Sequence, residues 1–461
     1  MILGPVLQRF ADQAPVAVTV RAALERVLSP EVLDAWFDQG RGRQYTRELL
    51  FSSVFELMSL VVFRAFPSVH AAQQSKRAEI GIGVSVTSIY NKLNGIDATT
   101  SGELVRDTAA KLAEVVEKLK GARASWLTGH RVKILDGNCI EASEHRLQVL
   151  RGTSAGPLPG KSLVVYDPAL EMVVDVFPCE DGHAQERSLI GEVLPTVEEG
   201  DLWIADRNFC TREFLSGVRN RKAHFIIRHH QNLPCVALNS ERFVGRCDTG
   251  EVYEQWVKLE DLDGKEYRCR RIRVRLKRKT RDGDRELFIL TSLPKSRARA
   301  KQVAQMYRRR WSIETMFQEL EAHLHSEVNT LGYPKAALFA FCVALVAYNA
   351  LAIFKAALRH VHGEEKIDQE VSGYYIAGEL ARTKEGMQIA LSSEEWSALQ
   401  LQRMSNEQFV RFLVSLATSV DLAKYKKHKR GPKKARKPRT EHLDKPHVST
   451  ARLLKDRKKS P

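Results

Sequence analysis

The sequence predicts an α/β fold, a mixed sheet followed by an all-β insertion and flanked by helical regions, and three observations support this. Short β-rich runs alternate with helical stretches between residues 130 and 228. Residues 229–301 contain further strand-like runs and an Asp-Gly turn. Residues 1–125 and the chain after 302 show the three- and four-residue apolar spacing of helices.

Composition narrows the class of protein. The 461 residues are 43% hydrophobic and 28% charged, with a net charge of +16, so a folded chain that meets polyanions is expected. The seven cysteines lack zinc-knuckle spacing, and the first residues lack the basic and apolar segments of a signal peptide. These features predict a cytoplasmic protein.

In the N-terminal helical region, residues 81–97 predict a turn that leads into a short helix. Ile89 and Leu93 would face inward, and Tyr90 and Lys92 would face a groove as in a DNA-binding helix-turn-helix. The alternative is an ordinary surface helix of a helical bundle.

The mixed sheet is predicted from five β-rich runs, with helical stretches at 183–195 and 211–220. The runs are residues 131–137, 161–168, 171–178, 201–209 and 223–228. The order of three strands, a helix, a strand, a helix and a strand is typical of a mixed α/β sheet.

The β-rich segment contains a strand with strictly alternating cations. One face carries Arg271, Arg273, Arg275 and Lys277, and the other carries Ile272, Val274 and Leu276. Cations on one face repeat every ~6.6 Å, which suits a phosphate backbone. The alternative is a solubilising edge strand.

Two segments near the C-terminus have extreme composition. Residues 336–354 carry no charge and imitate a membrane span, but a helix buried in a globular core is the favoured interpretation, and no membrane partner is expected. Residues 421–461 hold 16 of the 72 Lys and Arg residues and 4 of the 56 acidic residues. This predicts a disordered basic tail that binds nucleic acid by releasing counterions.

Two aspartates follow apolar strands in the same sequence context. Asp136 follows "VKIL" and precedes Gly-Asn, and Asp206 follows "LWIA" and precedes Arg-Asn. Each aspartate alone would be read as a turn former or helix cap. Together they predict one site at the carboxyl ends of strands, where active-site groups commonly lie.

A third acid, Glu314, lies on a predicted helix with Tyr307 and Arg310 on the same stripe. Arg310 could clamp a phosphate, Tyr307 could donate a hydrogen bond to it, and Trp311 could stack on a base or belong to the core. Three carboxylates without His or Cys ligands select Mg²⁺ or Mn²⁺, and two ions ~3.5–4 Å apart suit phosphodiester chemistry. The competing interpretation is a solvated helix with (i, i+4) charge pairs.

The chain resembles the DDE transposases of bacterial insertion sequences, of the type with a Tyr-Arg-Glu-Lys signature (insertion-sequence family four). Tyr307, Arg310 and Glu314 stand at the signature spacings, whereas the lysine position is Glu321. "ILDG" and "ADRNF" match the surroundings of the family's first and second aspartates. The resemblance implies a ribonuclease H-like catalytic core interrupted by the β insertion.

With this resemblance, the expected organisation has six parts. They are a helical DNA-binding region (1–125), the first part of the catalytic core (126–228), the β-rich insertion (229–301), the second part of the core (302–360), a helical region (361–420) and the basic tail (421–461).

The resemblance also implies a metal-dependent enzyme that cuts and joins double-stranded DNA at inverted terminal repeats and target DNA, as a homodimer. Asp136, Asp206 and Glu314 would hold the metal and carry out catalysis. Two alternatives remain open at this point: a metal-dependent nuclease without strand transfer, and a catalytically silent DNA-binding descendant.

Overall fold

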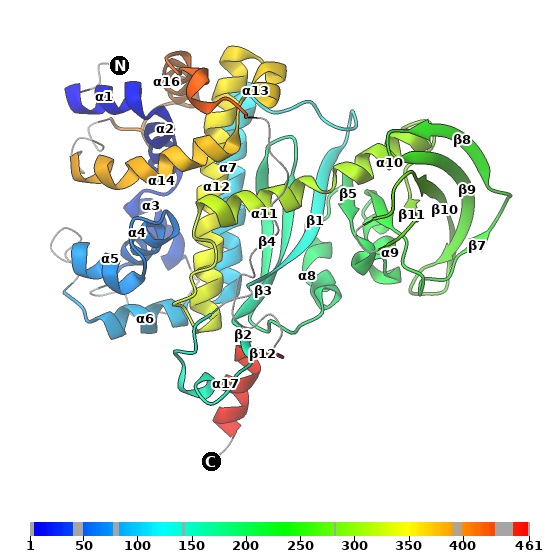
Figure 1. The fold of residues 1–461 in the computed structure, drawn as a ribbon, viewed down its shortest axis with the longest axis horizontal. Coiled ribbons are helices and arrows are strands. Elements are labelled where there is room, and N and C mark those ends of the chain that lie inside the picture. Colours follow the sequence, from blue (N-terminus) through cyan, green and yellow to red (C-terminus); the bar gives the residue numbers. More distant parts are fainter. Residues whose placement is uncertain are drawn as a thin grey trace.

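The computed structural model describes residues 4–39, 49–76, 83–140, 143–280, 283–390, 396, 399–428 and 446–459. One large mixed sheet runs through the molecule, with most of the helices gathered at one end and a curved group of strands at the other (Figure 1). The observed architecture is therefore the predicted α/β class, with a large mixed sheet and helices on both of its faces.

The main sheet has ten strands in the order β4-β3-β1-β5-β6-β11-β10-β9-β7, with β8 also paired to β9. Neighbours β1, β5 and β6 are parallel, and the other pairs are antiparallel. The strands are β1 Arg131–Ile140, β3 Gly160–Asp167, β4 Met172–Cys179, β5 Asp201–Ala205, β6 His224–Arg228, β7 Val236–Ala237, β8 Arg242–Cys247, β9 Gly250–Glu260, β10 Glu266–Leu276 and β11 Glu286–Thr291. All five β-rich runs predicted between residues 130 and 228 are confirmed as strands.

Helices form three groups along the chain. The N-terminal group is α1 Pro5–Gln13, α2 Pro15–Val27, α3 Pro30–Asp38, α4 Phe51–Val62, α5 Val69–Lys76, α6 Val86–Gly95 and α7 Ala98–Leu119. Short helices between the first strands are η1 Gln148–Leu150, η2 Glu186–Leu189, α8 Ile190–Val193, η3 Leu194–Thr196, η4 Arg207–Phe209 and α9 Arg212–Asn220. The later helices are α10 Ala300–Arg309, α11 Ser312–His323, α12 Pro334–His362, α13 Glu364–Glu370, α14 Gly373–Ala390, α16 Asn406–Thr418, η5 Leu422–Tyr425 and α17 Thr450–Lys459.

The central strands are buried on both faces, because successive side chains point to opposite sides of the sheet. Ile134, Ile204 and Ile226 are aligned across β1, β5 and β6 and belong to the core beneath α12. The next residues along, Leu135, Ala205 and Ile227, belong to the second core, on the side of α8 and α9. Such double burial explains why these strands read as continuous apolar runs.

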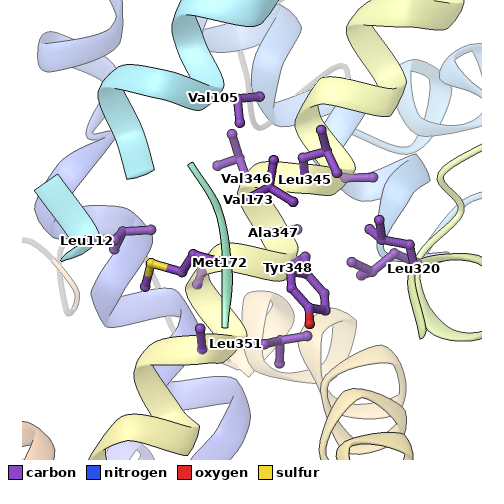
Figure 2. Packing of buried hydrophobic residues seen from close by; sticks show 14 of the residues in the cluster. Val105, Leu112, Met172, Val173, Leu320, Leu345, Val346, Ala347, Tyr348 and Leu351 are labelled. Atoms are coloured by element: carbon purple, nitrogen blue, oxygen red, sulfur yellow. The ribbon is translucent and has the colours of Figure 1, made fainter. Parts of the chain in front are cut away.

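Helix α12 is the buried helix predicted from the uncharged run. It begins at Pro334, where the missing N–H costs nothing, and ends before Gly363, whose φ of 87° suits glycine. Met172 and Val173 of β4 lie among Leu345, Val346 and Leu351 of α12 (Figure 2). Among the described residues α12 is the one helix long and apolar enough to cross a bilayer, and its most apolar window is wholly buried inside the fold.

A single polar side chain fixes α12 to the edge of the sheet. Strand β4 is an edge strand, so part of its backbone lacks a strand partner. Fully buried Asn349 accepts a hydrogen bond from the Val173 N–H and donates one to the Val173 carbonyl, both at 2.8 Å. The amide thus satisfies the edge as a neighbouring strand would, which explains an asparagine in an otherwise apolar helix.

The β-rich segment differs in one respect from the expected all-β insertion. Strand β11 pairs with β6 in antiparallel register, so β7 to β11 continue the main sheet and do not form a separate one. The predicted hairpin is present, with Arg275 opposite Glu286, although Asp282 of its turn lies outside the described residues. The charged strand therefore belongs to the same sheet as Asp136.

The expectation of a disordered tail over residues 421–461 is wrong for its last part. Strand β12 (His447–Ser449) pairs in parallel with β2 (Gly156–Leu158), and α17 follows it. Arg452 of α17 forms a salt bridge with Asp181 at 2.8 Å, and Thr450 is fully buried. Residues 429–445, which hold most of the basic cluster, lie outside the described residues.

Replacing Asn349 by Leu should lower the free energy of unfolding by about 2–4 kcal/mol, because two buried backbone groups of Val173 lose their partners. Urea unfolding monitored by circular dichroism measures the change. Asn91→Leu, at an exposed position of α6, is the control and should change stability by less than about 0.5 kcal/mol. Equal stability of Asn349→Leu and the parent protein would contradict this role.

Candidate active site

Asp136 and Asp206 stand side by side at one level of the sheet. Leu135 of β1 pairs with Ala205 of β5 in parallel register, and the two aspartates are the next residues of the two segments. By strand alternation Asp136 faces the same side as Ile134, which is the side of α11 and α12. The local sequence context thus places both carboxylates at the same point of the sheet, as predicted.

Hydrogen bonds to the backbone orient both carboxylates. Asp206 caps the short helix η4, where its Oδ1 accepts a hydrogen bond from the Asn208 N–H at 2.7 Å. Oδ1 of Asp136 accepts one from the Gly137 N–H at 3.0 Å. Each aspartate therefore does act as a local turn or cap residue, and it still leaves its second carboxylate oxygen for other partners.

Glu314 lies in the first turn of α11, and the continuous helical stripe predicted from Tyr307 to Glu321 is wrong. Helix α10 ends at Arg309 and α11 starts at Ser312. Between them the Arg310 N–H donates to the Tyr307 carbonyl, and the Ile313 N–H donates to the Arg310 carbonyl. These three-residue hydrogen bonds tighten the chain, so the register after Arg310 departs from a straight helix.

Arg310 lies between the carboxylates of Asp136 and Glu314. Its Nη1 donates to Oδ2 of Asp136 at 2.8 Å, and its Nη2 donates to Oε1 of Glu314 at 3.1 Å. Its side chain is only 10% exposed. The expectation that Arg310 presents a free phosphate clamp is therefore wrong for this state, because its guanidinium neutralises two of the three acids.

Buried Tyr307 interacts with the Arg310 side chain. Its hydroxyl is hydrogen-bonded to the Arg310 side chain, and burial raises the pKa of Tyr307 to about 12. The phenol therefore stays protonated at neutral pH and positions the guanidinium. It is not exposed as a phosphate donor.

Burial and several neighbouring charges act on the carboxyl group of Asp136. Burial raises the pKa of Asp136 to about 7, the Arg310 charge opposes this rise, and the nearby carboxylates of Asp206 and Glu186 add to it. Near neutral pH the site therefore holds more negative charge than Arg310 alone balances, and a further cation would relieve it.

Glu186 of η2 also belongs to the site. From the sequence alone, Glu186 could either contact the site from behind the metal ligands or stand at a helix start, and the helix start is the favoured interpretation. Its Oε2 accepts a hydrogen bond from Asn208 at 3.1 Å, and its carboxylate lies over Gly137. A side chain at position 137 would place Cβ 2.2 Å from Oε1 of Glu186, so the Glu186 carboxylate would have to move away from its present place. The glycine after Asp136 was the available signal, but it does not reveal which segment approaches it.

The donor set fits a hard divalent cation in chemistry, because it consists of carboxylate oxygens without His or Cys. Three separate segments supply the acids Asp136, Asp206 and Glu314. Arg310 joins Asp136 to Glu314 by hydrogen bonds, and the negative charge of Asp206 acts on Asp136. Among the described residues, no three acidic, His or Cys side chains already form a metal-binding group as they stand. Arg310 occupies Oδ2 of Asp136, one of the oxygens that a metal ion would use.

Lys92 of the expected DNA-reading helix is buried. Helix α6 begins after Ser85, and Ile89 and Leu93 face inward as predicted. The ammonium group of Lys92, however, donates to the Leu49 carbonyl, so it does not face a groove. Tyr90 is half-buried against the same core. The prediction that Lys92 contacts DNA is therefore wrong.

The four cations of the alternating strand divide into two pairs. Ile272 and Val274 are buried on the opposite face, as predicted. Arg273 is held by Glu241 and by Glu286 (2.7 Å), and Arg271 donates to Gln255 at 2.5 Å, so neither faces solvent as a free phosphate contact.

Arg275 and Lys277 are exposed, although Lys277 lies just beyond β10. Of the four cations predicted to face a phosphate backbone, two are therefore exposed to solvent, and the other two are held by neighbouring side chains.

Trp311 is 58% exposed, so the favoured expectation of a core tryptophan is wrong. It lies at the tight turn that carries Arg310, directly before α11. An exposed indole next to the carboxylates agrees with the alternative in which it stacks on a base.

Residues 127–350, which include all three acids, match the family model described as "Transposase DDE domain". The transposase for insertion sequence element IS421 of Escherichia coli is 27% identical over 260 residues, which cover 49% of this chain and 66% of that protein. InsL of insertion sequence element IS186A in E. coli K12, named as a transposase, matches to the same extent.

A protein of Sinorhizobium fredii named as transposase y4zB is 27% identical over 206 residues, 43% of this chain and 55% of its own length. The matches thus span about half to two thirds of these relatives. Residues 127–350 are therefore similar to transposase DDE domains, and about half of the chain is similar to transposases of bacterial insertion sequences.

Proposed function

We propose that this protein is a DNA transposase that cuts and joins phosphodiester bonds at the ends of its insertion sequence, with Asp136, Asp206 and Glu314 as the metal ligands. The observation that carries the proposal is the aligned register of Asp136 and Asp206, with Glu314 joined to Asp136 through Arg310. Three acids distant in sequence have no structural reason to converge on one partly buried point, where their mutual repulsion is costly.

Asp136, Asp206 and Glu314 would hold the divalent ions, Mg²⁺ or Mn²⁺, through their carboxylate oxygens. Bound there, the ions would supply charge neutralisation, promote deprotonation of the attacking hydroxyl and stabilise the leaving oxygen. Asn208 positions Glu186 by a hydrogen bond, and Glu186 adds negative charge that favours cations.

Arg310 would exchange partners during this process. In the metal-free state it satisfies Asp136 and Glu314. Released from these two carboxylates, the Arg310 guanidinium would be available to the scissile phosphate, for which its planar fork is suited. Tyr307 supports the Arg310 guanidinium in both arrangements.

The remaining features of the proposal rest on the relatives and the resemblance. The substrate is double-stranded DNA carrying inverted terminal repeats, together with target DNA, and the protein works as a homodimer in the cytoplasm, at the nucleoid. The core is ribonuclease H-like with a β insertion, of the Tyr-Arg-Glu-Lys type with Glu321 at the lysine position. Exposed Arg308 and Arg309, just before Arg310, are candidates to replace that lysine.

A second candidate, a catalytically silent DNA-binding descendant, is favoured by one observation. The salt bridge between Arg310 and Asp136 occupies the carboxylate that metal binding needs. The cleavage assay below separates the two, because a silent descendant binds end-containing DNA and leaves it intact at every Mg²⁺ or Mn²⁺ concentration.

Glu314→Gln should reduce Mg²⁺-dependent cleavage of end-containing DNA at least about a hundredfold while leaving DNA affinity unchanged, because it removes a metal ligand. Gel analysis of cleavage products and fluorescence anisotropy of DNA binding measure the two effects. Glu321→Gln is the matched control on the same helix and should retain activity within a few-fold. Equal activity of Glu314→Gln and Glu321→Gln would remove Glu314 from the mechanism.

The pKa of Asp136 predicts how the stability of the metal-free protein depends on pH. Because the folded-state pKa of about 7 exceeds the ordinary value of 3.8, stability from this group is full below about pH 4 and is lost as pH rises through about 7. Asp136→Asn removes this loss. From about pH 5 to about pH 8 the variant should gain about 2–3 kcal/mol relative to the parent.

Urea unfolding in EDTA at both pH values measures this difference. A variant-minus-parent difference that stays constant with pH would contradict the buried environment described for Asp136.

A further inference from the structure

A wide polar cleft of about 890 Å³ adjoins the carboxylates on the side of β6. Its walls come from η4, the end of β6 with the loop that follows, and the β10–β11 hairpin. Arg207, the residue after Asp206, and Arg228 lie at the end nearest the acids. The cleft is therefore a neighbour of the candidate active site along the chain and along the sheet.

The strand register shows how closely the two sites are joined. Ala205 of β5 pairs with Ile227 of β6, so Arg228 occupies the next level, in line with Asp206 and Asp136. Arg228 and Asp136 face the same side by alternation, and the Arg228 charge acts on Tyr307 within the site. Two carboxylates and a cation, those of Asp136, Asp206 and Arg228, thus stand in a row at one level of the parallel strands β1, β5 and β6.

The charge of the cleft is strongly one-sided. Six Arg and Lys side chains line it against two acids, and both acids are already paired: Asp284 with Arg228 at 2.5 Å, and Glu286 with Arg273 at 2.7 Å. Four of the cations, Arg207, Lys277, Lys279 and Arg285, are exposed and form no ion pair with any other residue that the structure describes. The cleft therefore presents positive charge that the fold does not use.

We propose that this cleft binds the DNA backbone on one side of the scissile phosphate and guides the strand into the carboxylate site. The inference rests on the proposed function and assigns the phosphate contacts to Arg207, Lys277, Lys279 and Arg285. It replaces the four-cation strand face expected from the sequence, in which Arg271 and Arg273 are held internally.

The remaining lining suits a nucleic acid strand better than a small anion. Exposed Gln231 and Asn232 add neutral hydrogen-bonding groups, and half-buried Phe288 adds an aromatic surface. The unpaired cations come from two separate segments, η4 and the β10–β11 hairpin, of a cleft of about 890 Å³. Spread charge matches a chain of phosphates, whereas one small anion needs convergent donors.

The test compares DNA binding of the full-length parent with that of Lys277→Ala/Lys279→Ala/Arg285→Ala, in EDTA so that no cleavage occurs. The probes are a short random-sequence duplex and the matching single strand, titrated by fluorescence anisotropy at several salt concentrations. The matched control, Lys111→Ala/Lys118→Ala/Lys265→Ala, removes three exposed lysines that do not line the cleft. Both triple variants change only exposed side chains, and circular dichroism verifies that they fold.

The cleft variant should bind at least one probe about tenfold or more weakly than the control does. The slope of log K against log salt should fall in magnitude by about two to three, near 0.9 for each lost phosphate contact on duplex. Equal affinity and equal slope of the two triple variants on both probes would overturn the inference.

This result is separable from the test of the active site. If the cleft variant binds like its control while Glu314→Gln abolishes cleavage, the cleft assignment fails and the proposed function stands. If Glu314→Gln cleaves normally while the cleft variant loses affinity, the protein is a DNA-binding protein whose catalytic site has been misassigned.

Discussion

Repulsion between buried carboxylates is the constraint on which the rest of the site depends. Asp136 lies near Asp206 and Glu186, and burial already disfavours its charge. Arg310 offsets this repulsion in the metal-free protein by bonding Asp136 and Glu314 together. A fold retains such a costly arrangement when the charges have a task, and binding of divalent cations is the task that suits carboxylate oxygens.

The sheet and α12 provide the rigidity that this arrangement needs. Strands β1, β5 and β6 are buried on both faces, so their register cannot slip by one residue without exposing apolar side chains. Helix α12 covers one face and is fixed to the edge strand through Asn349. The level of Asp136, Asp206 and Arg228 is thus set by packing on both sides of the sheet and not by the loops alone.

Features encoded by local pattern could be predicted from the sequence. β-rich runs of six to nine residues predicted the central strands, the uncharged run predicted α12, and the repeated strand-end context predicted that Asp136 and Asp206 meet. Each of these signals lies within a few neighbouring residues. The spacing of Tyr307, Arg310 and Glu314 also placed Arg310 and Glu314 within reach of each other.

Features that depend on contacts between distant segments could not be predicted. Alternation placed Arg273 on the polar face, but it could not show that Glu241, thirty-two positions away, covers that face. Lys92 follows a surface-helix pattern, yet its buried ammonium group donates a hydrogen bond to the Leu49 carbonyl. Glu186 reaches the site only because the folded chain brings η2 over Gly137.

The most direct test of the central claim is anomalous diffraction from crystals of the protein soaked in Mn²⁺. The account predicts anomalous density about 2.0–2.3 Å from carboxylate oxygens of Asp136, Asp206 and Glu314, with the Arg310 guanidinium turned away from Asp136. Density at other carboxylates only, with Arg310 still bonded to both acids at saturating Mn²⁺, would contradict it.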